Sequence, residues 1–121
     1  MDLLRVLILE DEPLISMNLE GIVEATVQSV VVVKASVAEG EKVIGQPFDF
    51  VLLDVDLTNG ATHGIARTLI ERQIPFSFVS GSRRMDLPAE LRGMPFIEKP
   101  YRPDEIVSAV LSAQEKNRRR S

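Results

Sequence analysis

The chain alternates short, strongly apolar runs with longer segments in which apolar residues recur at helical spacing. Short apolar runs are typical of buried strands, and the helical spacing is typical of helices with one apolar face. The predicted strands cover residues 6–9, 30–33, 50–53, 75–79 and 95–97. Helices are predicted to start at Pro13, at Ser36, near Ile65 and at Pro103, and prolines and capping serines favour such starts.

The segment from residue 82 to residue 93 gives the weakest helical pattern. Pro88 and Gly93 interrupt it, and only Leu87 and Leu91 have helical spacing. We therefore expect a fourth helix that is short or irregular.

The regular alternation of strands and helices indicates a parallel sheet covered by helices on both faces. Right-handed crossovers between parallel strands leave few possible topologies. We predict an α/β fold of the flavodoxin-like (βα)5 type, a doubly wound parallel sheet with strand order 2-1-3-4-5.

Composition narrows the class of protein further. The length of 121 residues suits one domain, covering residues 1–121 with a basic tail at residues 116–121. Hydrophobic residues make up 45% of the chain and aromatic residues 5%, so the core is expected to be aliphatic. Removing the charges of Arg118, Arg119 and Arg120 from the net charge of −4 leaves −7, which argues against direct contact with nucleic acid.

The sequence also lacks several features of secreted or membrane proteins. It contains no cysteine, which fits a reducing compartment, and its first residues do not have the form of a signal peptide. No apolar run approaches the roughly 18 residues of a membrane span. We expect a soluble, cytoplasmic protein without membrane insertion.

Acidic residues follow two of the predicted strands. Glu10 and Asp11 come after the first strand, and Asp54 ends the buried run at residues 50–53. The first and third strands are neighbours in the predicted order, so these acids should converge at one edge of the sheet, where ligands bind in open α/β folds. Mutual repulsion calls for a cation, and carboxylate oxygens in an open site suit Mg²⁺.

Two further polar residues follow the fourth and fifth predicted strands, at the same edge of the sheet. Ser80 comes after the fourth strand and Lys99 after the fifth. An ammonium group there can neutralise phosphoryl oxygens, and a hydroxyl can donate a hydrogen bond to one of them. Taken singly, each residue also suits an ordinary surface position.

Glu10-Asp11, Asp54, Ser80 and Lys99-Pro100 together resemble the characteristic residues of bacterial response-regulator receiver domains, over residues 5–111. The resemblance implies a signalling domain rather than an enzyme, whose only chemistry is its own phosphotransfer and dephosphorylation. Asp54 would accept a phosphoryl group from a sensor histidine kinase or a phosphotransfer protein. The implied Mg²⁺ ligands are Glu10 through water, Asp11, Asp54 and the backbone carbonyl of Asp56.

The same resemblance assigns roles in switching and output. Lys99 would contact the phosphoryl group, Ser80 would move toward it, and Phe96 matches the aromatic residue that turns inward, although plain core packing explains Phe96 equally well. Output would pass to a downstream protein partner, or the phosphoryl group would continue to another histidine protein. The expected output face comprises residues 83–91, the fifth strand and the last helix.

A finer resemblance is to an alphaproteobacterial subgroup of single-domain regulators whose fourth strand ends in Phe-Ala-Thr-Gly-Tyr. The matching residues are Phe78-Val79-Ser80-Gly81-Ser82, followed by Leu87-Pro88 and Lys99-Pro100-Tyr101. The chain departs from this motif at Val79, Ser80 and Ser82.

Two other functions remain open from the sequence. Asp54-Val55-Asp56-Leu57-Thr58 resembles the nucleophile motif of haloacid-dehalogenase-type phosphatases, in which Asp56 would be the general acid. Against this, that motif usually opens its domain, whereas here a strand and an acid pair precede it. The second alternative is a receiver-like module that binds partners without phosphorylation.

Overall fold

The computed structural model describes residues 3–120 and contains a central parallel sheet of five strands. This range leaves out Met1 and Asp2, which belong to the N-terminus that we expect to lack a signal peptide. It also leaves out Ser121, the last residue of the predicted basic tail. The sheet order is β2-β1-β3-β6-β7, which confirms the predicted 2-1-3-4-5 topology. The strands are β1 (Leu4–Leu9), β2 (Ser29–Lys34), β3 (Phe50–Leu53), β6 (Phe76–Ser80) and β7 (Phe96–Glu98).

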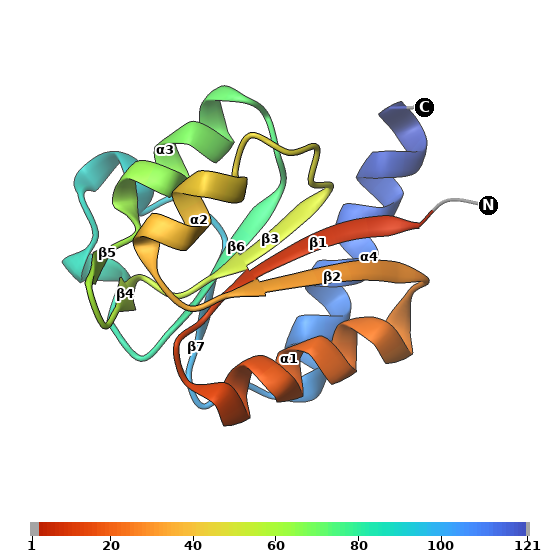
Figure 1. The fold of residues 1–121 in the computed structure, drawn as a ribbon, viewed down its shortest axis with the longest axis horizontal. Helices are drawn as coiled ribbons and strands as arrows, with labels where there is room; N and C mark the ends of the chain where they lie inside the picture. The colour runs from red at the N-terminus through yellow and green to blue at the C-terminus, as the bar shows by residue number, and fades with distance from the viewer. Residues whose placement is uncertain (1–2, 121) are drawn as a thin grey trace.

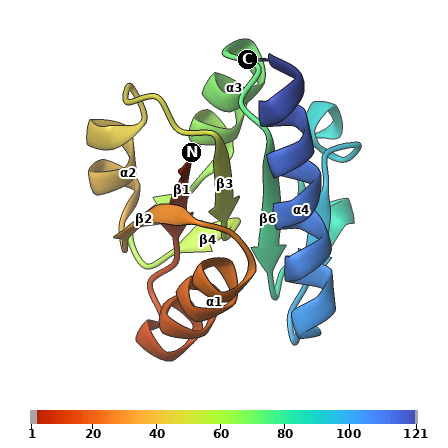
Figure 2. The same cartoon turned by 90° about the vertical axis from the view of Figure 1, so that its right-hand side faces the viewer.

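Helices cover both faces of this sheet (Figures 1 and 2). On one face α1 (Pro13–Thr26) packs against α4 (Pro103–Arg120), and the other face carries α2 (Val37–Val43) and α3 (His63–Glu71). Each layer encloses its own aliphatic core, because β1 and β3 are buried on both sides. Continuous apolar runs are expected for strands of this kind.

The helix starts follow from local chemistry. Pro13 occupies the first turn of α1, where the missing N–H costs nothing. Ser36 caps α2, since its Oγ accepts a hydrogen bond of 3.1 Å from the backbone N–H of Glu39. The capping sequence therefore predicted this start correctly.

A small hairpin follows the third strand, in a segment where the sequence pattern predicted no strand. Strands β4 (Asp56–Leu57) and β5 (Gly60–Ala61) pair with each other in antiparallel fashion. Gly60 has φ +147°, a backbone conformation that residues other than glycine rarely adopt. Because each strand contains only two residues, the pairing leaves no alternating pattern in the sequence.

The expected irregular fourth helix consists of two short 3₁₀ turns, η1 (Arg84–Asp86) and η2 (Ala89–Leu91). Leu87 and Leu91 are nonetheless fully buried in the same core as α3. Pro88 separates the turns, and the helical spacing of the two leucines therefore reports burial without an α-helix.

The basic residues near the end of the chain belong to the last turns of α4, which is helical through Arg120. Positive side chains at this position complement the negative end of the helix dipole. Among residues 3–120, no helix is both long and apolar enough to cross a membrane.

Candidate functional site

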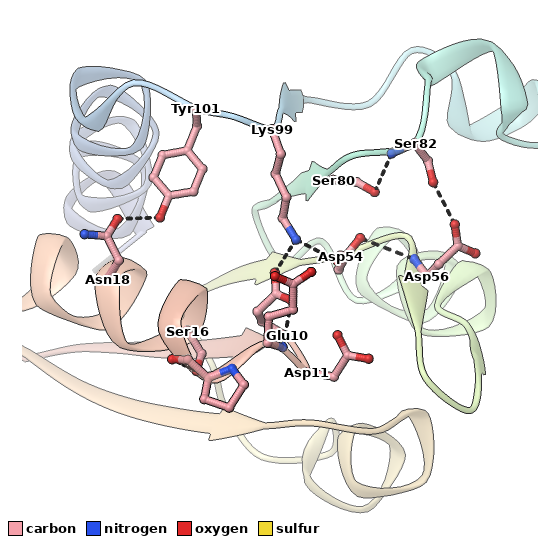
Figure 3. Close-up of polar contacts among 12 residues, drawn as sticks. Glu10, Asp11, Ser16, Asn18, Asp54, Asp56, Ser80, Ser82, Lys99 and Tyr101 are labelled. Carbon is pink, nitrogen blue, oxygen red and sulfur yellow. Dashed lines mark hydrogen bonds and ion pairs between the residues drawn. The ribbon is translucent and has the colours of Figure 1, made fainter.

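The candidate site lies at the carboxyl ends of four neighbouring strands (Figure 3). Strands β1 and β3 pair in register, with Leu9 opposite Leu53. The residues that follow, Glu10 and Asp54, therefore emerge side by side, and the Asp54 N–H donates to the carbonyl of Leu9 at 3.0 Å. The sheet thus joins residues that are far apart in the sequence.

Three carboxylates gather at this point. Glu10, Asp11 and Asp54 each present an oxygen within 4.8 Å of the others. Glu10 and Asp54 are buried, with exposed fractions of 2% and 8%. A compact set of hard oxygen donors fits a divalent cation such as Mg²⁺. The predicted convergence of these three acids is therefore present, and Asp56 follows two residues after Asp54.

Lys99 lies between two of the acids. Its Nζ contacts Glu10 Oε1 at 2.6 Å and Asp54 Oδ2 at 2.9 Å, and only 13% of its side chain is exposed. The Lys99 backbone N–H donates to the Ser80 carbonyl at 2.9 Å, which fixes the base of the side chain. One ammonium group thus offsets part of the charge of two buried carboxylates.

The surroundings shift the pKa values of these groups in different directions. Burial raises the pKa of Glu10, although Lys99 acts in the opposite sense. Burial also acts to lower the pKa of Lys99, but hydrogen bonds to Glu10 and Asp54 outweigh it, so this pKa is raised. Hydrogen bonds from Thr58 lower the pKa of Asp11. Asp11 and Lys99 therefore stay charged at neutral pH.

The β4–β5 hairpin supplies the partner of Asp11. Asp11 Oδ2 accepts a hydrogen bond of 2.7 Å from the Thr58 N–H and a second one from the Thr58 hydroxyl. The sequence drew attention to Thr58 only as part of the phosphatase-like motif. This contact depends on the path of the hairpin, so no spacing rule predicts it.

A second threonine fixes the main chain at Asp54. The Thr62 hydroxyl donates to the Asp54 carbonyl at 2.6 Å, and Thr62 is completely buried. The Thr62 N–H donates to the carbonyl of Val55 at 2.9 Å. The turn after β3 is therefore held on a rigid support, and the sequence gave no signal for this role of Thr62.

The opposite rim of the site contains two serines and Asp56. Ser80 is buried, and its Oγ accepts a hydrogen bond of 3.1 Å from the Ser82 N–H. The Ser82 hydroxyl donates to Asp56 Oδ2 at 2.7 Å (Figure 3). The exposed Asp56 side chain is therefore directed toward the β6–η1 loop.

Aromatic residues border the site on two sides. Phe96 is half-buried, its ring lies 5.9 Å from that of Phe78, and the Arg84 guanidinium lies 5.4 Å from its centroid. Tyr101 is also half-buried, and its hydroxyl donates to Asn18 Oδ1 on α1. Burial raises the pKa of Tyr101. These contacts link β7 and the start of α4 to the neighbouring elements.

Comparison with known proteins gives a sequence relative as well as structural neighbours. No protein-family model matches the chain. The phyllosphere-induced regulator PhyR of Methylorubrum extorquens is 30% identical over 124 residues, which cover 96% of this chain and 46% of PhyR. The chain thus spans less than half of that relative.

Two solved structures are similar over nearly their whole length. SdrG of Sphingomonas melonis is 33% identical, with a TM-score of 0.72, and the match covers 92% of this chain and 99% of SdrG. A CheY-like response regulator receiver domain protein of Methanospirillum hungatei has a TM-score of 0.81 at 20% identity. That match covers 99% of this chain and 100% of the other, and at this identity it shows the shared fold.

Proposed function

The chain belongs to the response regulator receiver domains, and from this premise we propose that Asp54 accepts a phosphoryl group from a phosphohistidine. The observation that carries the proposal is the arrangement of Lys99 between Glu10 and Asp54, with Asp11 beside them. Buried acids that share a lysine and offer oxygens to a cation form a site suited to phosphoryl chemistry.

The reaction is a displacement at phosphorus. A carboxylate oxygen of Asp54 attacks, the bond between phosphorus and the donor histidine nitrogen breaks, and the electron pair stays on that nitrogen. The product is an acyl phosphate on Asp54, and the donor leaves as a histidine that takes up a proton. Positioning and charge stabilisation provide most of the rate enhancement in such transfers.

Lys99 and the acids provide this stabilisation. Lys99 is within 2.9 Å of Asp54 Oδ2, so its ammonium can pass from the carboxylate to an incoming phosphoryl oxygen. Glu10 and Asp11 would hold Mg²⁺ together with Asp54, and the Asp56 carbonyl is the further ligand that we propose. Bound Mg²⁺ would supply positive charge for the phosphoryl oxygens and lessen the repulsion among the acids.

Phosphorylation would be read out at the β6–η1 loop. In this structure the Ser80 oxygen accepts a hydrogen bond from the Ser82 N–H, which leaves the Ser80 O–H able to donate, and we propose that Ser80 moves toward a phosphoryl oxygen on Asp54 to make that bond. Such a movement would change the packing of Phe96 and the surface formed by η1, η2, β7 and α4. A local charge is thereby converted into a change at a protein-binding surface.

The proposed partners are proteins. The donor is a histidine kinase or a phosphotransfer protein, and the output is a contact with a downstream protein or a further phosphotransfer. PhyR contains more than twice the length matched here, so the role of its remaining part is not carried over. We include a cytoplasmic location in this proposal, because a cysteine-free chain fits a reducing compartment.

The decisive experiment is incubation of the full chain with Mg²⁺ and a small phosphodonor such as acetyl phosphate. We expect intact-mass analysis to find one phosphoryl group per chain, absent from Asp54→Asn and absent when EDTA removes the metal. The carboxamide has nearly the shape of the carboxylate, so the variant tests the nucleophile and not the fold.

The same measurement separates the competing functions. Repeated turnover of a phosphomonoester, with no stable label on Asp54, would favour the phosphatase suggested by Asp54 and Asp56. An unlabelled chain that still binds its partner would favour a module that acts without phosphorylation. Either outcome contradicts the proposed phosphoacceptor.

A further inference from the structure

The hairpin that follows Asp54 contacts the proposed metal site. At its tip, Thr58 donates two hydrogen bonds to Asp11 Oδ2, one of 2.7 Å from the backbone N–H and one from the hydroxyl. Asp11 itself is half-buried and lies in the loop between β1 and α1. Thr58 thus binds this carboxylate through both its backbone N–H and its hydroxyl.

The position of Thr58 is itself fixed on both sides. Leu57 is only 6% exposed and belongs to the core beneath α2 and α3. Asn59 Oδ1 accepts a hydrogen bond of 3.2 Å from the Val37 N–H at the start of α2. Asp56, at the other end of β4, is bound by Ser82. The hairpin therefore presents the Thr58 hydroxyl from a supported element and not from a free loop.

We propose that Thr58 is a positioning residue of the metal site, which holds Asp11 Oδ2 so that the second carboxylate oxygen faces the cation. This inference rests on the proposed function, because it assigns a supporting residue to the same site. The bound ion would be a hard divalent cation, and Thr58 would act on it only through Asp11.

The physical basis is the cost of ordering a ligand. An aspartate in a partly exposed loop samples several rotamers, and a metal that binds it must overcome this loss of freedom. Hydrogen bonds from Thr58 to Asp11 Oδ2 hold the carboxylate in one orientation and so reduce this cost before the metal binds. Replacement of such supporting residues in known metal sites typically weakens metal binding by about 10–100-fold.

Competition between Thr58 and the cation for the same oxygen would change the metal affinity in the opposite direction. If Thr58 occupied the oxygen that the cation needs, the two hydrogen bonds would have to break on binding. Removing the hydroxyl would then strengthen metal binding. The direction of the change in affinity therefore distinguishes support from competition.

The test is isothermal titration of the full-length chain with Mg²⁺, and with Mn²⁺ as a second probe. Thr58→Val retains the shape and the backbone N–H but removes the hydroxyl, and we expect the Kd to rise about tenfold. Thr58→Ser restores the hydroxyl and should bind within about twofold of the unmodified chain. Thr68→Val, which removes an exposed hydroxyl that bonds only to the Gly64 carbonyl on α3, is the matched control.

The outcomes separate this inference from the proposed function. An unchanged or lower Kd in Thr58→Val, or an equal rise in Thr68→Val, would overturn the role of Thr58. Asp11→Asn and Asp54→Asn test the metal site itself, and unaltered Mg²⁺ binding in both would refute that site. Urea unfolding of each variant checks that the fold is retained. If Thr58→Ser shows the same raised Kd as Thr58→Val, that result also counts against the inference.

Discussion

At the scale of single residues, Lys99 dominates the electrostatics of the site. It is the cation in contact with the buried carboxylates of Glu10 and Asp54, and its own side chain is 13% exposed. Removing one member of a buried ion pair leaves the other charge buried without compensation. This lowers the free energy of unfolding far more than the loss of an exposed ion pair does. Lys99 is therefore expected to matter for stability as well as for phosphoryl transfer.

We expect Lys99→Met to lower the free energy of unfolding by about 3 kcal/mol in the absence of Mg²⁺. The methionine fills the volume of the lysine stem but leaves two acids facing each other without a cation. Urea denaturation in EDTA measures the loss. The double variant Glu10→Gln with Lys99→Met removes one of the acids and should recover part of it; no recovery would contradict this account.

Residue positions in the site were predictable to different degrees. Glu10, Asp11, Asp54, Ser80 and Lys99 could be found because each ends or directly follows a buried strand, and parallel strands bring their carboxyl ends together. Thr58, Thr62 and Ser82 act through hydrogen bonds whose partners depend on the path of a loop. No periodicity encodes such a path, and these three contacts could be seen only in the structure.

At the scale of the elements, two helical glycines show how packing overrides intrinsic propensity. A Cβ at Gly40 in α2 would lie 2.9 Å from Leu9 Cδ2 and 3.1 Å from Ile65 Cδ1, both in the buried core. A Cβ at Gly21 in α1 would meet nothing within 4 Å. Gly40 therefore allows α2 to approach the sheet closely, whereas Gly21 has no such role.

We expect Gly21→Ala to stabilise the protein by about 0.5–1 kcal/mol, because alanine loses less backbone entropy in a helix. Gly40→Ala should instead destabilise it by about 1 kcal/mol, since the overpacking of Leu9 and Ile65 exceeds the same gain in propensity. Thermal unfolding of both variants gives the comparison. Equal effects of the same sign would show that packing does not decide the difference.

The elements themselves were predictable where a long pattern exists. The five sheet strands and the four α-helices follow from apolar runs, helical spacing and caps such as Ser36. The β4–β5 hairpin was not predicted, because pairs of residues are too short to alternate. The helical spacing of Leu87 and Leu91 correctly indicated that both side chains are buried. It did not indicate an α-helix correctly, because Pro88 prevents a continuous helix.

At the scale of the whole molecule, the sheet joins the proposed metal ligands to the stability of the fold. The acids follow β1 and β3, which are among the strands that are buried on both faces. A ligand that binds only the folded chain stabilises it by mass action. Metal binding should therefore raise the stability of the entire domain.

We expect Mg²⁺ at about 100 times its Kd to stabilise the protein by about 2.7 kcal/mol. The folded state collects the three carboxylates, whereas the unfolded chain separates them. Thermal unfolding with Mg²⁺ and with EDTA measures the effect. Asp11→Asn should lose most of it, and a similar gain in that variant would show that Mg²⁺ acts elsewhere.

We expect the exterior of α1 to contact the proposed phosphodonor next to the site. Leu14 and Met17 lie one helical turn apart and are 82% and 65% exposed, although both side chains are apolar. Their helix begins directly after the acidic loop. A donor protein that reaches Asp54 would cover this pair, and its burial would favour binding.

We expect Leu14→Glu to slow phosphoryl transfer from a donor histidine protein about tenfold, because a charge would be buried in the contact. Transfer from acetyl phosphate should stay unchanged, since this small donor needs no docking surface. Radiolabel transfer kinetics with both donors provide the comparison. Ile70→Glu changes a half-exposed residue on the opposite helical layer and should affect neither rate.

The position of Tyr101 has a practical consequence for measurements of metal binding and phosphoryl transfer at this site. The chain contains one tyrosine and no tryptophan, so its intrinsic fluorescence comes from a single known place. That ring lies two residues after Lys99 and holds Asn18 of α1 through its hydroxyl. Its emission intensity and anisotropy should therefore report events at the sheet edge without an added dye. The protein therefore contains its own optical probe for the proposed phosphorylation of Asp54.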